Sequence, residues 1–283
     1  MKEALSADLA AVRDLALQAG RMLLDSMGKI KSIEQKTATE FVTDVDRRVE
    51  DMLIAGLNQR FPGDSILAEE SGNNPGNKER TWYVDPLDGT TNYAHGYPFF
   101  SVSIAAGDAS GLRLGAVFAP YLDELYLAEA GKGALMERPL HGISRSLDRR
   151  EPVTMEQALL ATGFPYLRDE IVAKNTGLAR DFLMARCHGV RRGGSAAIDL
   201  VHVACGKLDG YWEWRLRPWD TAAGTLVARE AGALVTDFSG REISIPTENI
   251  LAAAPRLHPQ MLEVLLPALT AGEDRALEVK DEQ

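Results

Sequence analysis

Trp82-Tyr83-Val84-Asp85-Pro86-Leu87-Asp88-Gly89-Thr90-Thr91-Asn92 is the stretch of the chain that carries the most structural information. The three residues before Asp85 favour a β-strand, and Pro86 fixes φ at about −65° and has no backbone donor, so we expect the strand to end at Asp85. Asp88 follows within the same tight turn, and residues 89–91 offer backbone N–H groups and hydroxyls of the kind that hold phosphate at a helix start. The stretch therefore predicts a cation site beside a phosphate site.

A simpler interpretation of this stretch is a turn in which Asp88 caps a short helix, which the order Asp-Gly-Thr-Thr would serve. Capping needs only one carboxylate and leaves Asp85 unexplained. We therefore prefer the functional interpretation.

Other acidic residues also stand at the ends of predicted elements. Residues 65–68 predict a short strand that delivers Glu69 and Glu70 at its end, and the two face opposite ways if the strand continues. Asp46 opens a helix with the spacing of a capping box, and Asp220 begins a helix where N-capping would also explain an acid. Each of these acids therefore has a structural explanation beside a functional one.

The stretch Asp85-Pro-Leu-Asp-Gly-Thr-Thr-Asn92 resembles the first signature of the inositol monophosphatase family, whose members are magnesium-dependent, lithium-sensitive phosphomonoesterases. Residues 219–224 (Trp-Asp-Thr-Ala-Ala-Gly), continuing to Glu230-Ala231-Gly232, resemble its second signature, and residues 68–72 (Ala-Glu-Glu-Ser-Gly) resemble a third feature. The resemblance covers about residues 5 to 270, and the run Arg-Leu-Arg-Pro-Trp-Asp at 215–220 points to the bacterial branch.

The resemblance implies a role for individual residues. The metal ligands it implies are Glu69, Asp85, the Leu87 carbonyl, Asp88 and Asp220. The phosphate contacts are Gly89, Thr90 and Thr91, and the catalytic residues are Glu69, Thr90 and Asp88, with Glu69 and Thr90 orienting and deprotonating the attacking water. The substrate contacts are Gly194, Ser195, Ala196 and Glu213, of which Glu213 would otherwise be an exposed acid at a strand end. Asp46, mostly through water, and Glu70 are implied to support the metal ligands.

The resemblance brings four carboxylates together, and this arrangement requires cations. Like charges about 4 Å apart repel by about 4 kcal/mol per pair at an effective dielectric near 20. Ligation by oxygen alone selects magnesium or manganese over zinc, so we expect two or three Mg²⁺ ions, with Mn²⁺ as an alternative. Two ions about 3.5 to 4 Å apart can activate water, orient phosphate and neutralise the leaving alkoxide without a covalent intermediate.

Length and composition limit the class of protein. A chain of 283 residues can bury roughly three quarters of its unfolded surface without disulfides. The net charge of −10 argues against direct nucleic-acid binding, and no Lys/Arg run indicates a membrane surface. Cys187 and Cys205 are the only cysteines, and no signal core or membrane-spanning run is visible. We therefore expect a soluble cytoplasmic protein.

The predicted fold is a layered α/β (α+β) sandwich of two lobes. Residues 1–142 form an N-terminal lobe with an antiparallel sheet and two helices, which carries Glu69 and the motif at 85–91. Residues 143–270 form a C-terminal lobe with a mixed or parallel sheet covered by helices, which carries Glu213 and Asp220. Residues 73–77 are expected to be a loop, residues 271–283 a charged tail, and the small residues 222–224 are expected to let the Asp85 turn approach.

The predicted activity is hydrolysis of myo-inositol monophosphates by metal-activated water, in a homodimer. Histidinol-phosphate, fructose-1,6-bisphosphate and 3′-phosphonucleotide phosphatases are the alternatives within the same superfamily. A regulatory or interaction protein with incidental phosphatase activity is the alternative from another class. Arg191 and Arg192 are interpreted as contacts for a second anionic group or for another subunit. Lys36 could approach the same site as Asp46, but we interpret it as a solvated surface charge.

Overall fold

The computed structural model of the protein describes residues 5–36, 41–148, 154–165 and 169–270, so the predicted tail at 271–283 lies outside the described residues. The helices are α1 (Ala7–Ser26), α2 (Asp44–Arg60), α3 (Thr90–Ala94), α4 (Glu170–Met184), α5 (Ala196–Cys205), α6 (Pro218–Glu230) and α7 (His258–Thr270). The strands are β1 (Ile33–Gln35), β2 (Phe41–Thr43), β3 (Ser65–Ala68), β4 (Gly72–Asn74), β5 (Thr81–Asp88), β6 (Ser101–Asp108), β7 (Gly111–Ala119), β8 (Glu124–Glu129), β9 (Ala134–Arg138), β10 (Ile143–Ser146), β11 (Leu159–Thr162), β12 (Gly189–Arg191), β13 (Gly210–Trp214), β14 (Leu234–Thr236) and β15 (Asn249–Ala253).

Within the described residues, the strands form a ribbon of β1 and β2 and two larger sheets. The large sheet has the order β10-β9-β8-β7-β6-β5-β3-β4, and the small sheet has the order β12-β11-β13-β15-β14. In the large sheet β3 and β5 are parallel, because the chain turns back through β4 on the outer edge of β3 before it enters β5. In the small sheet β12, β11 and β13 are parallel, and β13, β15 and β14 are antiparallel. The fold is α/β as predicted, with one parallel pair in a sheet that was expected to be antiparallel.

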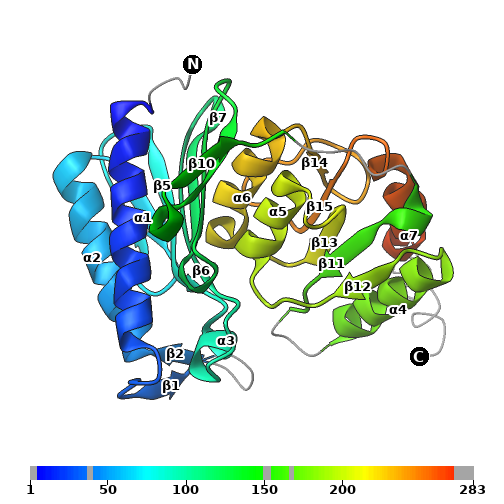
Figure 1. The fold of residues 1–283 in the computed structure, drawn as a ribbon, viewed down its shortest axis with the longest axis horizontal. Coiled ribbons are helices and arrows are strands. Elements are labelled where there is room, and N and C mark those ends of the chain that lie inside the picture. Colours follow the sequence, from blue (N-terminus) through cyan, green and yellow to red (C-terminus); the bar gives the residue numbers. More distant parts are fainter. Residues whose placement is uncertain (1–4, 37–40, 149–153, 166–168, 271–283) are drawn as a thin grey trace, which may run out of the picture.

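Helices and sheets alternate in five layers (Figure 1). α1 and α2 cover one face of the large sheet, α5 and α6 fill the space between the two sheets, and α4 and α7 cover the outer face of the small sheet. Alternation along β13 follows these layers, since Tyr211 belongs to the core around α5 and α6 whereas Trp212 and Trp214 belong to the core under α4 and α7. Burial on both faces explains why the strands of the small sheet are apolar runs.

Small residues let α6 approach its neighbours closely. A Cβ added at Gly224 would lie 2.6 Å from the Cβ of Leu200 on α5. A Cβ added at Gly115 on β7 would lie 3.0 Å from the carbonyl oxygen of Ala223. Gly224 therefore lies against α5 and Ala223 against β7, and α6 also contacts β5, the strand that carries Asp85.

Two predicted boundaries differ from the structure. The large sheet continues past residue 142, because β10 pairs with β9 before the chain leaves for the small sheet. The predicted loop at 73–77 begins as strand, because β4 pairs with the edge of β3. Both strands are short and carry mostly exposed or partly exposed residues. Their pairing depends on backbone hydrogen bonds at a sheet edge, which leave no apolar pattern in the sequence.

No helix in the described ranges is both long and apolar enough to cross a membrane. Cys187 is buried and Cys205 is partly exposed, and neither takes part in a disulfide. Cys187 packs in the core under α4, as expected for a thiol that behaves as a small hydrophobic side chain.

The packing of α6 on α5 predicts opposite effects for two glycine substitutions. Gly224→Ala should lower the free energy of unfolding by about 1 to 3 kcal/mol, since overpacking against Leu200 outweighs the better helix propensity of alanine. Gly177→Ala, inside α4 where an added Cβ meets nothing within 4 Å, should raise it by about 0.5 to 1 kcal/mol. Urea unfolding of both variants measures the difference, and equal stabilisation by the two would contradict the close packing.

Candidate active site

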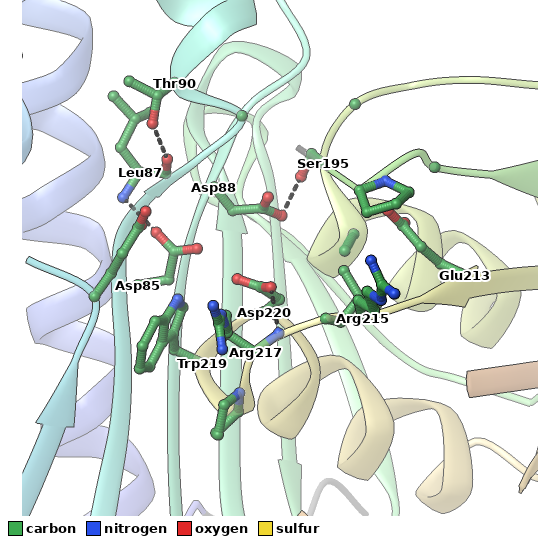
Figure 2. Close-up of a pocket in the computed structure, with 18 of the residues that line it drawn as sticks. Asp85, Leu87, Asp88, Thr90, Ser195, Glu213, Arg215, Arg217, Trp219 and Asp220 are labelled. Carbon is green, nitrogen blue, oxygen red and sulfur yellow. Dashed lines mark hydrogen bonds between the residues drawn. The ribbon is translucent and has the colours of Figure 1, made fainter. Parts of the chain in front are cut away.

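A cleft of about 1070 Å³ opens between the two lobes, where the end of β5 meets the first turns of α5 and α6. Figure 2 shows the carboxylates of Asp85, Asp88 and Asp220 turned toward one space, with Glu213 farther along the cleft. The acids that line the cleft are Glu69, Glu70, Asp85, Asp88, Asp199, Glu213, Asp220 and Glu248. The basic residues that line it are Lys36, Arg47, Arg192, Arg215 and Arg217. The predicted metal ligands therefore share one cleft with several basic side chains whose position there was not predicted from the sequence.

β5 does not end at Asp85 as predicted but continues to Asp88. Asp85 pairs with Ser103 of β6 and Asp88 pairs with Ser101, so the register shifts between the two acids. The extra residue in β5 forms an irregularity at the proline, which has no N–H to give to the sheet. This irregularity is the reason that both acids can be delivered from one strand.

Gly89 ends the strand with a backbone conformation that favours glycine. Its φ is +97°, and an added Cβ would lie 3.0 Å from the carbonyl oxygen of Phe99 and 3.2 Å from that of Gly194. Gly89 and Thr90 line the cleft at the start of α3. Thr91, the third predicted phosphate contact, is exposed and is not among the residues that line the cleft.

Asp88 is held by the first turn of α5 from the other lobe. The Ser195 hydroxyl donates to Asp88 Oδ2 at 2.6 Å, and the Ala197 N–H donates to the same oxygen at 2.8 Å. Ser195 is buried and caps α5, and its Oγ lies 3.2 Å from that of Ser101 on β6. The predicted substrate contacts Gly194, Ser195 and Ala196 line the cleft, but the Ser195 hydroxyl is engaged in positioning an acid.

Asp85 and Asp220 each accept a hydrogen bond from a nearby backbone N–H. The Leu87 N–H donates to Asp85 at 2.9 Å, and the Arg217 N–H donates to Asp220 at 2.7 Å. The start of α6 is also tied to the large sheet, because the Ser103 hydroxyl donates to the Trp219 carbonyl at 2.9 Å. Asp220 is therefore an N-terminal helix residue and a cleft residue at once.

Glu69 and Glu70 follow β3, where Lys36 joins them. The Lys36 ammonium lies 3.2 Å from a Glu69 oxygen and 2.6 Å from a Glu70 oxygen, so its interpretation as a solvated surface charge is wrong. The buried carboxylate of Glu50 accepts the N–H groups of Glu70 and Ser71, both at 2.8 Å. Lys36 and Glu50 thus fix the turn that presents Glu69.

Asp46 reaches the site through Thr90. Its carboxylate completes the predicted capping box of α2 with Thr43 and also lies 3.1 Å from the Thr90 hydroxyl, which in turn lies 3.0 Å from the Leu87 carbonyl. Asp46 is buried and does not line the cleft. The structural and the functional explanation of this residue are therefore compatible.

Burial raises the pKa values of the acids at this end of the cleft, although basic residues also line it. Burial raises the pKa of Glu69 to about 7 against the opposing effect of Lys36, and burial raises the pKa of Asp88 to about 6 against its hydrogen bonds to Ser195 and Ala197. Burial and the charges of the neighbouring acids hold the pKa of Asp85 and Asp220 well above the usual range. Bound cations would offset the repulsion between these carboxylates and lower their pKa values.

The donor set fits a hard cation, although the ligands do not close on one point. Every candidate ligand offers oxygen, which suits magnesium or manganese. Among the described residues, no group of three or more His, Cys, Asp or Glu side chains is close enough to form a ready-made metal site. One oxygen of each of Asp85, Asp88 and Asp220 accepts a hydrogen bond from a backbone N–H, and the three carboxylates still face one common space (Figure 2).

Glu213 and its surroundings form the other end of the cleft. Glu213 is buried and accepts a hydrogen bond from the Tyr211 hydroxyl, so the alternative of an exposed strand-end acid is wrong. Burial raises its pKa to about 7, opposed by Tyr211 and Arg192. Arg192 lines the cleft, whereas Arg191 does not.

Sequence reasoning missed several residues that hold the site. Glu50 stands four residues after Asp46 on an otherwise apolar helix face, and two acids at that spacing were a usable signal. Ser101 and Ser103 alternate at the start of an apolar strand, which also marks one polar side of the sheet. Asp199 had no such signal, because an acid in the first turn of a helix is common.

The chain is similar to known proteins along most of its length. The sequence matches the model of the inositol monophosphatase family over residues 5–271. It is 38% identical over 258 residues to an inositol-1-monophosphatase of Synechocystis, covering 89% of this chain and 86% of that protein. It is 37% identical over 253 residues to a putative Nus factor SuhB of Neisseria meningitidis, covering 88% of this chain and 94% of the relative.

Solved structures with the same fold include two bacterial relatives. The extragenic suppressor protein SuhB of Bartonella henselae has a TM-score of 0.85 at 35% identity, covering 92% of this chain and 98% of that chain. The inositol monophosphatase of Anabaena has a TM-score of 0.81 at 37% identity, covering 92% and 95%. The fold and its order of elements are therefore shared along nearly the whole chain.

Glu50 should affect metal binding without contacting the metal. Glu50→Gln replaces one acceptor oxygen by an NH₂ group that faces a backbone donor, so the turn carrying Glu69 should loosen and the affinity for Mn²⁺ should fall by about tenfold or more. Isothermal titration of Mn²⁺ measures the change, and circular dichroism checks the fold. The control is Glu156→Gln, an exposed acid that does not line the cleft. Equal Mn²⁺ affinity of the two variants would exclude the positioning role of Glu50.

Proposed function

The chain belongs to the inositol monophosphatase family, and from this premise we propose that it is a magnesium-dependent phosphomonoesterase that hydrolyses myo-inositol monophosphates to myo-inositol and phosphate. The observation that carries the proposal is a single cleft with Glu69, Asp85, Asp88 and Asp220 at one end and buried Glu213 at the other. The first end suits a phosphate with its cations, and the second suits a hydroxylated alcohol.

Glu69, Asp85, Asp88, Asp220 and the Leu87 carbonyl would hold the cations. When bound, these ions would supply an activated water, a polarised phosphate and a neutralised leaving oxygen. The residues of the chain orient the reactants around them. The amide groups at the start of α3 bind phosphate oxygens, and Asp220 faces the leaving group.

Thr90 and Glu69 position the attacking water. The Thr90 hydroxyl can donate a hydrogen bond to Asp46, 3.1 Å away, so its oxygen lone pairs can accept a hydrogen bond from water. Glu69 can accept the proton that the water loses on attack. Lys36 keeps the Glu69 carboxylate oriented through its ion pair.

Glu213 accepts hydrogen bonds from the hydroxyl groups of the alcohol. The Tyr211 hydroxyl donates a hydrogen bond that fixes the Glu213 carboxylate. Gly163 leaves room for this carboxylate, since an added Cβ there would lie 2.0 Å from Glu213 Oε2. This fixed acceptor supports inositol over alcohols without ring hydroxyls. Histidinol phosphate, a sugar bisphosphate and a 3′-phosphonucleotide are the competing substrates.

A second candidate function is regulatory. Relatives in Neisseria meningitidis, Vibrio cholerae and Pseudomonas aeruginosa are named Nus factor SuhB. Complementation of a gene deletion by an inactive Asp88→Asn protein would support such a role for this chain, and failure to complement would support the enzymatic one. The homodimer and the cytoplasmic location stay predictions, and sedimentation analysis tests the first.

Asp88→Asn should abolish activity and leave the fold intact. The amide oxygen can still accept the hydrogen bonds from Ser195 and Ala197, but the charge that binds cations is lost, so kcat/KM should fall by at least about a hundredfold. Phosphate release from inositol 1-phosphate should also stop in chelator and return with magnesium, and lithium should inhibit it. Wild-type turnover by the variant, or by the chelated protein, would refute the metal mechanism.

Glu213→Gln should distinguish the competing alcohols. Losing an ionic contact to an ammonium costs more than weakening a contact to a neutral hydroxyl, so kcat/KM should fall modestly for inositol 1-phosphate and far more for histidinol phosphate. The wild-type protein should prefer inositol 1-phosphate by at least about tenfold. If a panel of phosphate esters showed the opposite preference, the proposed substrate would be wrong and the metal mechanism would still stand.

A further inference from the structure

Two residues without an assigned role stand beside Glu213 at the alcohol end of the cleft. Asp199 lies in the first turn of α5 and Arg192 lies in the segment between β12 and α5, and both line the cleft. Asp199 is 3% exposed and Glu213 is 7% exposed, so both carboxylates are withdrawn from bulk water. In the described part of the chain, no hydrogen bond from a protein donor ends on the Asp199 carboxylate. A buried acid that faces a cleft without a donor is a candidate ligand contact.

Glycines make room for all three side chains. An added Cβ at Gly193 would lie 2.3 Å from the Phe99 ring and 3.1 Å from Asp199 Oδ1, and one at Gly194 would lie 2.6 Å from a terminal guanidinium nitrogen of Arg192. Glu213 occupies the space beside Gly163 in the same way. The side-chain amide of Asn175 on α4 donates a hydrogen bond to the Gly163 carbonyl. The backbone at these glycines therefore passes close to all three charged groups.

The charges of the three groups act on one another. Burial and then the charges of Glu213 and Asp88 raise the pKa of Asp199, while Arg192 lowers it. Arg192 also lowers the pKa of Glu213. Within the described ranges, none of the ion pairs uses Arg192, so its donors remain available at the cleft although it acts on both acids.

This combination of two acids and one arginine discriminates between classes of alcohol. A second phosphate at this end would be repelled by two carboxylates, and the positive charge of Arg192 offsets part of the attraction that the carboxylates exert on an ammonium. A hydroxyl group donates one hydrogen bond and accepts others, so neighbouring hydroxyls can donate to the carboxylates and accept from the guanidinium. The arrangement is complementary to an uncharged polyol.

We propose that Asp199 and Arg192 are substrate-selecting residues that, with Glu213, bind neighbouring hydroxyl groups of a polyol phosphate ester. The proposal rests on the proposed phosphomonoesterase function and adds the residues that choose its alcohol. Asp199 accepts hydrogen bonds from the hydroxyl groups, and the positive charge of Arg192 opposes the binding of amino alcohols.

The test compares three esters. These are inositol 1-phosphate, p-nitrophenyl phosphate, whose alcohol has no other hydroxyl, and histidinol phosphate, whose alcohol carries an ammonium. Asp199→Asn should lower kcat/KM for inositol 1-phosphate at least about tenfold more than for p-nitrophenyl phosphate. Arg192→Gln should lower the preference for inositol 1-phosphate over histidinol phosphate by about tenfold, and Arg192→Lys should restore part of it. Asp181→Asn, a matched change at a partly exposed acid of α4 outside the cleft, should alter neither ratio.

The outcomes separate the inference from the function on which it rests. Absence of metal-dependent phosphate release from every ester by the wild-type protein would overturn the proposed function. Equal losses for inositol 1-phosphate and p-nitrophenyl phosphate in Asp199→Asn would show a structural role and overturn the selection by Asp199. An unchanged ratio in Arg192→Gln would overturn the charge argument. Arg192 is exposed, so its variants remain informative if Asp199→Asn fails to fold by circular dichroism.

Discussion

Mutual repulsion between buried carboxylates is the constraint on which the site depends. Each acid at the proposed metal-binding end of the cleft contacts a nearby donor. Asp85 and Asp220 each accept a hydrogen bond from a backbone N–H. Asp88 accepts one from the first turn of α5, and Glu69 pairs with the Lys36 ammonium. These donors limit the cost of gathering like charges in a space that excludes much of the solvent. They also hold the acids in place against their mutual repulsion.

The same hydrogen bonds join the two lobes. Asp88 comes from the large sheet, whereas Ser195 and Ala197 belong to a helix that leads into the small sheet. On the far side of α5, the Glu124 carboxylate on β8 accepts hydrogen bonds from the Tyr126 hydroxyl and the Lys207 ammonium. α5 is thus held at both ends to the large sheet, and the position of Asp88 depends on the packing of the whole middle layer.

Sequence reasoning reached the fold class and the acids of the cleft but not their partners. Signatures around Asp85 and Asp220 are local and carry strong turn chemistry, so their roles as cleft residues could be predicted. Lys36 contacts Glu69, which is 33 positions away in the sequence, and Glu50 accepts the N–H of Glu70, which is 20 positions away. Contacts between such distant positions leave no local pattern. The end of β5 was placed too early at Asp85, because the irregularity that accommodates Pro86 depends on its register with β6. The edge strands β4 and β10 were missed for a different reason, because their partners β3 and β9 are close in the sequence but their own side chains are mostly polar and exposed or partly exposed.

The division of the cleft has a consequence for how this protein and its relatives can diverge. Glu69, Asp85 and Asp88 lie on or beside the large sheet, whereas Asp199, Glu213 and Gly163 lie on elements of the small sheet or on the helix that leads into it. The fourth acid, Asp220, lies on α6. Substitutions that change the alcohol can therefore accumulate on the side of the small sheet while Asp220 and the carboxylates of the large sheet stay fixed. A family built in this way can inherit one hydrolytic reaction and exchange its substrates through a few positions of a single lobe.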